Sequence, residues 1–280
     1  MAATLYVVAT PIGNLEDMTY RAVRILREVD LVAVEDTRHA RKLLEHYGID
    51  RPLLSLHEHN EAQRLEPVLS RLEGGASIAV ISDAGTPLIS DPGFQLVREA
   101  RRRGIAVSPV PGASAITAAL SVAGLPTDRF VYEGFLPAKP AARRRRLEQL
   151  VTEPRTLVLL ESSHRIRQAL ADLVGVFGEA REAVLARELT KRFETLANAG
   201  LGELEDWLRT DPNQCKGEFV ILVGGAPASE RRADEAEVDR ILALLVASLP
   251  VKQAAALASG ITGEPRNRLY KRALELADTP

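Results

Sequence analysis

Cysteine and aromatic residues are scarce in this chain, and no apolar run approaches the roughly 20 residues of a transmembrane helix. Cys215 is the only cysteine among 280 residues, which excludes an internal disulfide and any metal site built on several thiolates. Aromatic residues make up 4%, so an RNA-binding sheet that stacks bases on many Phe and Tyr side chains is not expected. Because the start also lacks the pattern of a signal peptide, we expect a cytoplasmic protein without membrane association.

Neither sign of charge dominates. The chain has 36 Lys and Arg residues and 38 Asp and Glu residues, which gives a formal net charge of −2. General electrostatic attraction to nucleic acid is therefore not expected, and any basic surface must be local. With 46% apolar residues the chain has ample material for a core, and its length predicts about two domains with a small appendage.

Short β-branched apolar runs alternate with amphipathic segments over the first 112 residues. Strands are expected at 5–9, 31–34, 77–82 and 105–110. Helices are expected at 19–29, 38–47, 61–72 and 93–103, the second ending at Gly48 and the fourth at Gly104. This alternation predicts a mostly parallel sheet with helices on both faces.

The pattern changes after Leu125 and Pro126. Further strands are expected at 130–135, 156–160, 183–189 and 219–224, with helices at 141–151, 165–176 and 201–209. A polar linker then leads into helical patterns at 234–248, 252–259 and 265–276, with Gly260 and Gly263 in the last turn. We therefore predict an N-terminal α/β domain at 1–112, a second α/β or α+β domain at 113–225, and a linker with a helical tail at 226–280.

Gly- and Pro-rich turns follow three expected strands of the first domain. They are TPIGN at 10–14, SDAGTPLISDPG at 82–93 and VPGASA at 110–115. Ligands of open α/β sheets bind beyond the carboxyl ends of strands, and glycine lets the backbone approach them closely. None of the turns matches the dinucleotide or P-loop patterns, so nicotinamide and ATP are disfavoured. Asp83 can accept hydrogen bonds from a ribose or ammonium group, whereas Asp91, before Pro92, is expected to cap the next helix.

Six strings, in order, carry a resemblance to a known family. TPIGNLED at 10–17, VEDTR at 34–38, the 82–93 loop and VPGASA resemble the tetrapyrrole-methylase family, the class III S-adenosylmethionine methyltransferases. ESSHR at 161–165, LARELTKRFET at 185–195 and KGEFVILV at 216–223 are similar to its ribosomal small-subunit methyltransferase I subfamily. The resemblance implies two α/β domains of tetrapyrrole-methylase type with the cofactor cleft between them, plus a small C-terminal helix-turn-helix-like domain. It also implies a homodimer.

The same resemblance implies a reaction and a set of cofactor contacts. The subfamily uses S-adenosylmethionine to methylate the 2′-hydroxyl of a cytidine in the decoding region of 16S rRNA, within the small ribosomal subunit. The implied cofactor contacts are Pro11, Asp83, Ala84, Gly85, Thr86, Ile89, Ser90, Gly112, Ala113 and Ser114.

Charged residues after the strands of the second domain are candidates for the chemistry. A 2′-hydroxyl loses its proton as it attacks a methyl group, and a positioned basic side chain can take that proton. The candidates are Glu161, His164, Arg165 and Lys191. The alternative is a surface network of ion pairs, which contributes little energy.

Two basic segments are candidates for RNA contact. One is the run of arginines that opens a helix after Pro140, of which we select Arg143 and Arg144, although such runs are often only solvated helix faces. The other is the last helix of the tail, which has a helix-turn-helix pattern and carries Arg266, Arg268, Lys271 and Arg272. This tail could instead pack as a cap.

Two other functions compete with the rRNA enzyme. A methyltransferase of the same fold could act on a carbon of a tetrapyrrole ring, but a basic tail has no use there. A non-enzymatic nucleic-acid-binding protein could use the tail alone, but it leaves the three turns unexplained. No metal site is expected, since His57 and His59 lack a third ligand at suitable spacing.

Overall fold

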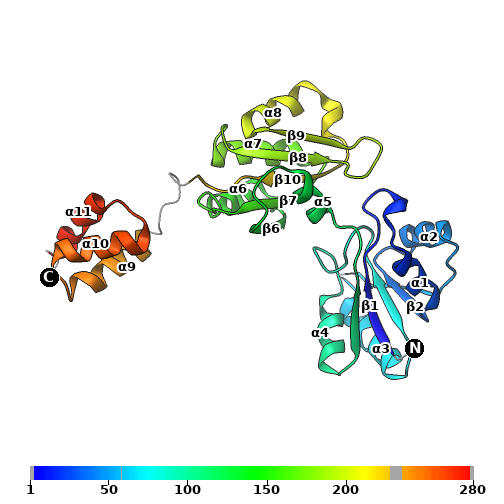
Figure 1. Ribbon diagram of the computed structural model, residues 1–280. Coiled ribbons are helices and arrows are strands. Elements are labelled where there is room, and N and C mark those ends of the chain that lie inside the picture. The colour runs from blue at the N-terminus through cyan, green and yellow to red at the C-terminus, as the bar shows by residue number, and fades with distance from the viewer. Residues whose placement is uncertain (1–2, 58, 228–234, 278–280) are drawn as a thin grey trace. The chain divides into compact units, whose positions relative to one another are not determined.

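The computed structural model describes residues 3–57, 59–227 and 235–277 (Figure 1). The chain divides into two compact units. The first comprises Met1–Arg146 and Thr156–Gly224, and the second comprises Leu147–Arg155 and Gly225–Pro280. Each unit has its own core and is described separately.

The first sheet of the first unit is fully parallel, in the order β3-β2-β4-β1-β5. Its strands are β1 (Thr4–Val8), β2 (Leu31–Val34), β3 (Leu53–Ser55), β4 (Ile78–Ile81) and β5 (Ala106–Val110). Four helices follow them in the chain: α1 (Tyr20–Glu28), α2 (Thr37–His46), α3 (Glu61–Glu73) and α4 (Phe94–Arg102). One apolar cluster joins α1 and α2 to the sheet and another joins α3 and α4, so both faces are covered, as predicted (Figure 1).

The second sheet of this unit is mixed, in the order β6-β7-β10-β8-β9. Its strands are β6 (Phe130–Phe135), β7 (Thr156–Ser162), β8 (Glu182–Arg187), β9 (Thr195–Gly200) and β10 (Glu218–Val223). Only β6 and β7 pair in parallel. The remaining helices of this part are α5 (Ala115–Val122), α6 (Pro140–Glu148), α7 (Ile166–Phe177) and α8 (Leu201–Thr210), with short 3₁₀ turns at Leu15–Asp17 and Pro212–Cys215. The two predicted sheets and the α/β class are confirmed.

Three elements have no counterpart in the sequence prediction: β3, α5 and β9. β3 has three half-buried residues, too few to show a period. β9 lies at the edge of its sheet and carries the weakly apolar sequence TLANAG. Nearly all residues of α5 are apolar or small, so it has no distinct polar face. From sequence, such a run is ambiguous between strand and helix.

Asp91 does not cap α4, which corrects the sequence expectation. The residue at the N-cap position is Gly93, whose φ of 112° places it in the left-handed region, and it makes no side-chain cap. Instead, Glu61 of α3 accepts hydrogen bonds from the amides of Gln95 and Leu96, at 3.0 and 3.3 Å. A cap supplied by another helix leaves the carboxylate of Asp91 available for a different role.

Arg143 is a structural residue, which corrects its assignment to RNA contact. Its relative exposure is 1%, and its guanidinium Nε and Nη2 both lie 2.7 Å from Asp172 Oδ2. Arg144 is exposed and lies 3.7 Å from the other oxygen of the same carboxylate. A guanidinium that is buried and paired in this way is not accessible to a phosphate.

Replacing Asp172 with asparagine should strongly destabilise the protein. The substitution leaves the buried guanidinium of Arg143 without its counter-charge, which typically costs about 3–5 kcal/mol. Asp206→Asn is the matched control, because its ion pair with Arg209 is exposed and should contribute less than about 1 kcal/mol. Urea unfolding of both variants measures the difference, and equal midpoints would refute the structural role of Arg143.

In the described part of the second unit from residue 235 onward, the helices are α9 (Glu235–Val246), α10 (Val251–Thr262) and α11 (Arg266–Ala277). They pack through Val238, Leu242, Ala255, Ala258, Leu269 and Ala273. α10 runs through Gly260 and ends at Gly263, whose φ of 74° turns the chain into α11. The helix-turn-helix pattern of the sequence is therefore a pair of packed helices joined by a glycine turn.

Candidate functional site

The three Gly- and Pro-rich turns meet because β4, β1 and β5 are neighbours in the first sheet. Thr10 and Gly85 exchange backbone hydrogen bonds of 2.8 and 3.1 Å, which join the first turn to the second. The hydroxyl of Thr86 donates to the carbonyl of Ala113 at 3.2 Å, which joins the second turn to the third. Gly85 has a φ of 77°, a conformation that side chains other than glycine rarely adopt.

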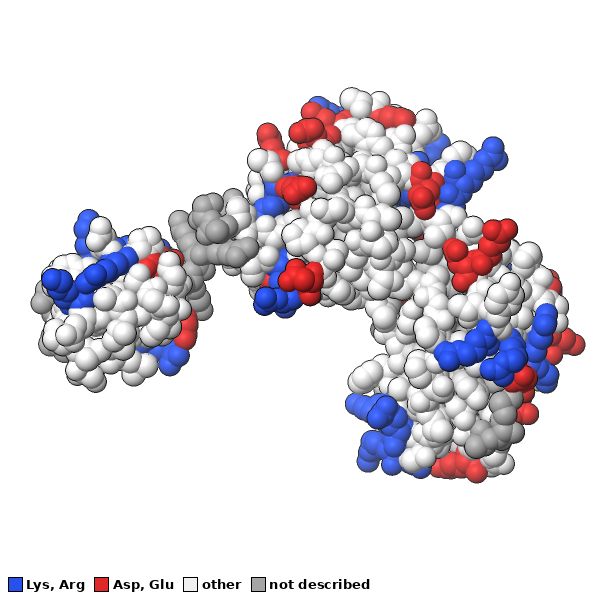
Figure 2. Space-filling view, viewed as in Figure 1, with Lys and Arg blue, Asp and Glu red and all other residues white. Residues whose placement is uncertain are grey.

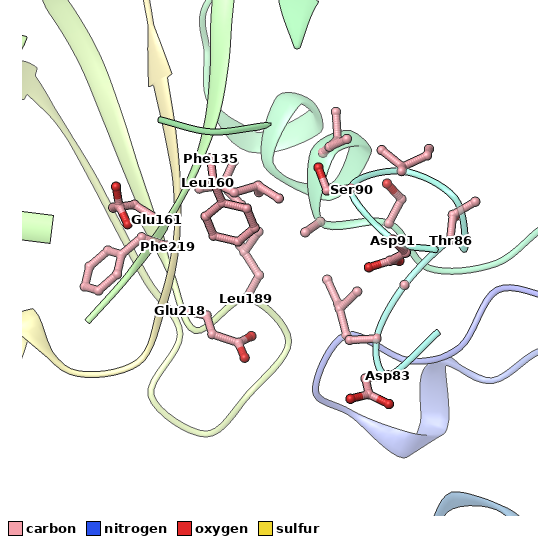
Figure 3. Close-up of a pocket in the computed structure, with 18 of the residues that line it drawn as sticks. Asp83, Thr86, Ser90, Asp91, Phe135, Leu160, Glu161, Leu189, Glu218 and Phe219 are labelled. Atoms are coloured by element: carbon pink, nitrogen blue, oxygen red, sulfur yellow. The ribbon is translucent and has the colours of Figure 1, made fainter. Parts of the chain in front are cut away.

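These turns form one wall of a cavity of about 470 Å³ in the first unit. Figure 3 shows Asp83, Thr86, Ser90 and Asp91 on this loop wall. The second wall comes from the second sheet and the chain that follows it, with Phe135, Leu160, Leu189, Phe219 and Glu218 (Figure 3). A hydrogen bond of 2.7 Å between the hydroxyls of Ser90 and Tyr132 connects the two walls.

Most of the predicted cofactor residues line this cavity. They are Asp83, Ala84, Gly85, Thr86, Ile89, Ser90 and Ser114. Pro11, Gly112 and Ala113 do not line it. Pro11 and Ala113 are next in the chain to the lining residues Ile12 and Ser114, and Ala113 also accepts the hydrogen bond from Thr86.

Three carboxylates gather at the loop wall: Glu35, Asp83 and Asp91. Burial raises the pKa of Glu35, and the nearby charges of Asp83 and Asp91 raise it further. Burial also raises the pKa of Asp91, and Asp83 adds to this, against a hydrogen bond from Ser82 that lowers it. Ser90 next to Asp91 has a φ of 67°, a strained conformation of the kind concentrated at functional sites. The wall is thus electronegative and partly shielded from water.

Glu161 borders the cavity, but its carboxylate points away from the loop wall in Figure 3. Its residue exposure is 3%, and Oε2 lies 3.2 Å from an Nη of Arg165. Arg165 also donates to the carbonyl of Leu136 at 2.5 Å. The pair therefore links the end of β7 to the start of α7, and of the two residues only Glu161 lines the cavity.

The other two candidates lie outside the cavity lining. His164 is exposed. Lys191 Nζ donates to Glu188 at 3.0 Å and to Glu218 at 2.9 Å. Although burial alone would lower it, the pKa of Lys191 is raised overall by these two carboxylates, so the amine stays protonated at neutral pH. The stem of Lys191 packs against Gly13 in the first turn, where a Cβ atom would collide with it.

Basic side chains gather on the second unit in Figure 2, but several are neutralised within it. Arg272 pairs with Asp239 at 2.6 Å and with Glu275 at 2.7 Å, and Arg268 pairs with Glu264 at 2.7 Å. Arg266 and Lys271 are exposed and form no ion pair with another described residue. The pairing of Arg272 could not be predicted from the sequence of α11 alone, because its partner Asp239 belongs to α9.

Within residues 3–57, 59–227 and 235–277, no group of three or more His, Cys, Asp or Glu residues is arranged to hold a metal ion. The rings of His57 and His59 are 6.1 Å apart and edge-to-face. No helix in the same ranges is long and apolar enough to span a membrane.

Comparison with known families gives two matches along the chain. The tetrapyrrole (corrin/porphyrin) methylases match residues 4–205, and the RsmI C-terminal HTH domain matches residues 232–277. The chain is 58% identical over 275 residues to ribosomal RNA small subunit methyltransferase I of Pseudomonas aeruginosa, covering 98% of both chains. It is 55% identical over 271 residues to the protein of that name from Escherichia coli O157:H7, covering 97% of this chain and 94% of the relative.

Solved structures share the fold at low sequence identity. Diphthine synthase matches with a TM-score of 0.61 and 18% identity, over 82% of this chain and 99% of its own. A cobalt precorrin-4 methyltransferase matches with a TM-score of 0.59 and 19% identity, over 79% of this chain and 95% of its own. Uroporphyrin-III C-methyltransferase from Thermus thermophilus, complexed with S-adenosylhomocysteine, matches with a TM-score of 0.54 and 19% identity, over 79% and 97%.

Proposed function

Since the chain belongs to the tetrapyrrole methylase family, and within it to the ribosomal RNA small subunit methyltransferase I group, we propose that it methylates small-subunit rRNA with S-adenosylmethionine. The proposed acceptor is the ribose 2′-hydroxyl of a cytidine in the decoding region. The observation that carries the proposal is the joint occurrence of a turn-lined cavity and a helical unit that matches the RsmI C-terminal HTH domain.

The residues of the cavity fit S-adenosylmethionine. Its volume lies within the usual range of about 300–1,000 Å³ for small-molecule sites. Gly85 lines the cavity without a side chain, and Glu35, Asp83 and Asp91 offer negative charge to a sulfonium. We propose that the turns at 83–86, 89–90 and 114 hold the cofactor, which supplies an electrophilic methyl group when bound.

The chain itself has two tasks in this reaction: to align the 2′-hydroxyl and to accept its proton. Among the four charged residues predicted from sequence, Arg165 and Lys191 are bound to acids and fit positioning roles better than proton transfer. Asp91 lines the cavity, is relieved of capping, and has a raised pKa, which favours it as the proton acceptor. Glu35, whose pKa is also raised, is the alternative.

The test of the function is a methylation assay on assembled small ribosomal subunits with labelled S-adenosylmethionine. We expect label in rRNA, and nuclease digestion followed by mass spectrometry should find it as 2′-O-methylcytidine. Naked rRNA and a porphyrinogen serve as competing substrates. Label on a base, on another nucleotide or on the porphyrinogen would refute the proposed specificity.

The basic side chains of α11 that form no ion pair, Arg266 and Lys271, should contribute to rRNA affinity. Arg266→Gln with Lys271→Gln removes two exposed cations, so we expect weaker subunit binding and a salt slope shallower by about 1.4 for two lost phosphate contacts. Arg272→Gln is the matched control, because this arginine is already paired with Asp239 and Glu275. Binding measured across salt concentrations decides, and an unchanged slope in the double variant would remove α11 from the RNA interface.

A further inference from the structure

We propose that Arg192 and Phe193 form a stacking platform for an RNA base next to the target nucleotide. The proposal rests on the proposed rRNA function and adds a site to it. Both residues belong to the loop at 188–194, between β8 and β9. Four observations support the assignment: the exposure of the ring, the rigidity of the loop, its closeness to the cavity, and the unpaired charge.

Phe193 presents its ring to solvent. Its relative exposure is 63%, among the highest of the large apolar residues in the described ranges. The guanidinium carbon of Arg192 lies 5.5 Å from the ring centroid, a cation–π geometry. One face of the ring is thus covered by a cation, and the high exposure leaves the rest available. Single-stranded nucleic acids are bound by such rings, on which bases stack without strong sequence preference.

The loop that carries the ring is held firmly. Lys191 ties it to Glu188 and Glu218, and the amide of Thr190 donates to Glu194 at 2.6 Å. The hydroxyl of Thr190 accepts from the amide of Asn14 in the first turn, at 3.2 Å. Glu188 and Thr190 have φ values of 51° and 65°, conformations that persist only when surrounding contacts enforce them. The exposed ring is therefore displayed by its loop and cannot easily fold back onto the surface.

The platform lies close to the cavity along the chain. Leu189 and Glu218 line the cavity, and Glu218 is the residue that holds Lys191 (Figure 3). Phe193 follows Leu189 by four residues, so the two α-carbons are separated by at most about 14 Å. A nucleotide bound at the cavity would thus have its neighbour within reach of the ring.

The charge next to the ring favours RNA over a protein partner. Arg192 is exposed and forms no ion pair with any described carboxylate, in contrast to Lys191, which has two. In the chain, Phe193 is flanked by the charged residues Arg192 and Glu194. An exposed ring beside an unneutralised cation matches the base and phosphate of a single strand.

Phe193→Ala in the full-length protein tests the platform. We expect its dissociation constant for small ribosomal subunits to rise about tenfold, within the range of losing one stacked base, with unchanged affinity for S-adenosylmethionine. Phe193→Trp should retain tight binding, because it keeps an aromatic face. Phe94→Ala is the matched control: Phe94 is 61% exposed and Arg98 lies 5.4 Å from its ring, but it opens α4 instead of the 188–194 loop.

Three outcomes would distinguish failure of the platform, occupation of the ring by a second copy of the protein, and failure of the proposed function. If the unaltered protein methylates rRNA and Phe193→Ala binds subunits as tightly as Phe94→Ala does, the platform is refuted and the function stands. If Phe193→Ala changes the sedimentation of the free protein, a second copy occupies the ring and the platform is likewise refuted. If the unaltered protein transfers no methyl group to rRNA, the proposed function itself fails.

Discussion

Gly85→Val should raise the dissociation constant for S-adenosylmethionine at least about a hundredfold, equivalent to ~2.8 kcal/mol, while the protein remains folded. Gly85 has a φ of 77°, which a β-branched residue adopts only under strain. Its Cβ would also lie 3.3 Å from Cγ2 of Ile12, and both residues line the cavity. Isothermal calorimetry of the purified variant measures the loss.

Gly104→Val is the control for backbone strain, because Gly104 does not line the cavity. Its φ of 73° is close to that of Gly85, and nothing lies within 4 Å of an added Cβ. It should lower stability by a comparable amount and leave cofactor affinity intact. Gly112→Val is a different case, because its Cβ would lie 3.0 Å from that of Ala9, outside the cavity lining, and should act through local repacking. Normal affinity in Gly85→Val would remove the second turn from the cofactor site.

The loop wall of the cavity could be predicted from sequence because its signal is local. Apolar runs that stop at TPIGN, SDAGTPLISDPG and VPGASA locate the strand ends, and glycine and proline mark the turns. What the pattern does not contain is the strand order. The turns meet because β1 lies between β4 and β5, and only the tertiary structure establishes those neighbours.

The opposite wall could not be derived from local patterns. Tyr132, Phe135 and Leu189 come from distant segments, and each alone resembles an ordinary strand or loop residue. The resemblance identified the neighbouring strings ESSHR and LARELTKRFET, but not which side chains face inward. Leu160, Glu161 and Ser162 at the end of β7 all border the cavity, so the two-residue alternation of a strand does not tell which side chains line it.

Long-range partners explain the remaining differences. The sequence does not distinguish Arg143 from the three arginines that follow it, because its buried partner Asp172 lies 29 residues away. The Asp-Pro-Gly pattern before α4 predicts a cap by Asp91, but the amides at the start of α4 donate to Glu61 of α3. In both cases the deciding partner is distant in the chain, and a local sequence pattern does not contain it.

Asp91→Asn should lower the single-turnover rate of methyl transfer by about 10²–10⁴-fold at saturating cofactor, the usual effect of losing a general base. Asn is nearly isosteric and keeps the cavity shape, so subunit binding should change little. Glu35→Gln and Asp83→Asn serve as matched controls, because both remove a carboxylate from the same wall. If methyl transfer is slowed in Glu35→Gln and not in Asp91→Asn, Glu35 is the proton acceptor.

The four residues predicted from sequence are tested in the same assay. Near-normal rates in all four alanine variants would mean that these residues act only in the structure: Glu161→Ala, His164→Ala, Arg165→Ala and Lys191→Ala.

The pH dependence gives a second, independent reading of Asp91. Because burial raises its pKa above the ordinary value of 3.8, the unaltered protein should lose activity on acidification at a higher pH than a free carboxylate would dictate. The pH profile of Asp91→Asn should lack that acidic limb.

The contribution of Asp91 to the free energy of unfolding should change with pH in the opposite direction from the activity. A carboxyl with a raised folded-state pKa binds more protons folded than unfolded, so its contribution to stability falls as pH rises through the interval between the two pKa values. Asp91→Asn should therefore unfold at a higher temperature than the unaltered protein at pH 7 and lose that advantage near pH 3. A variant that is slower and also less stable at neutral pH would show that Asp91 supports the fold instead of accepting the proton.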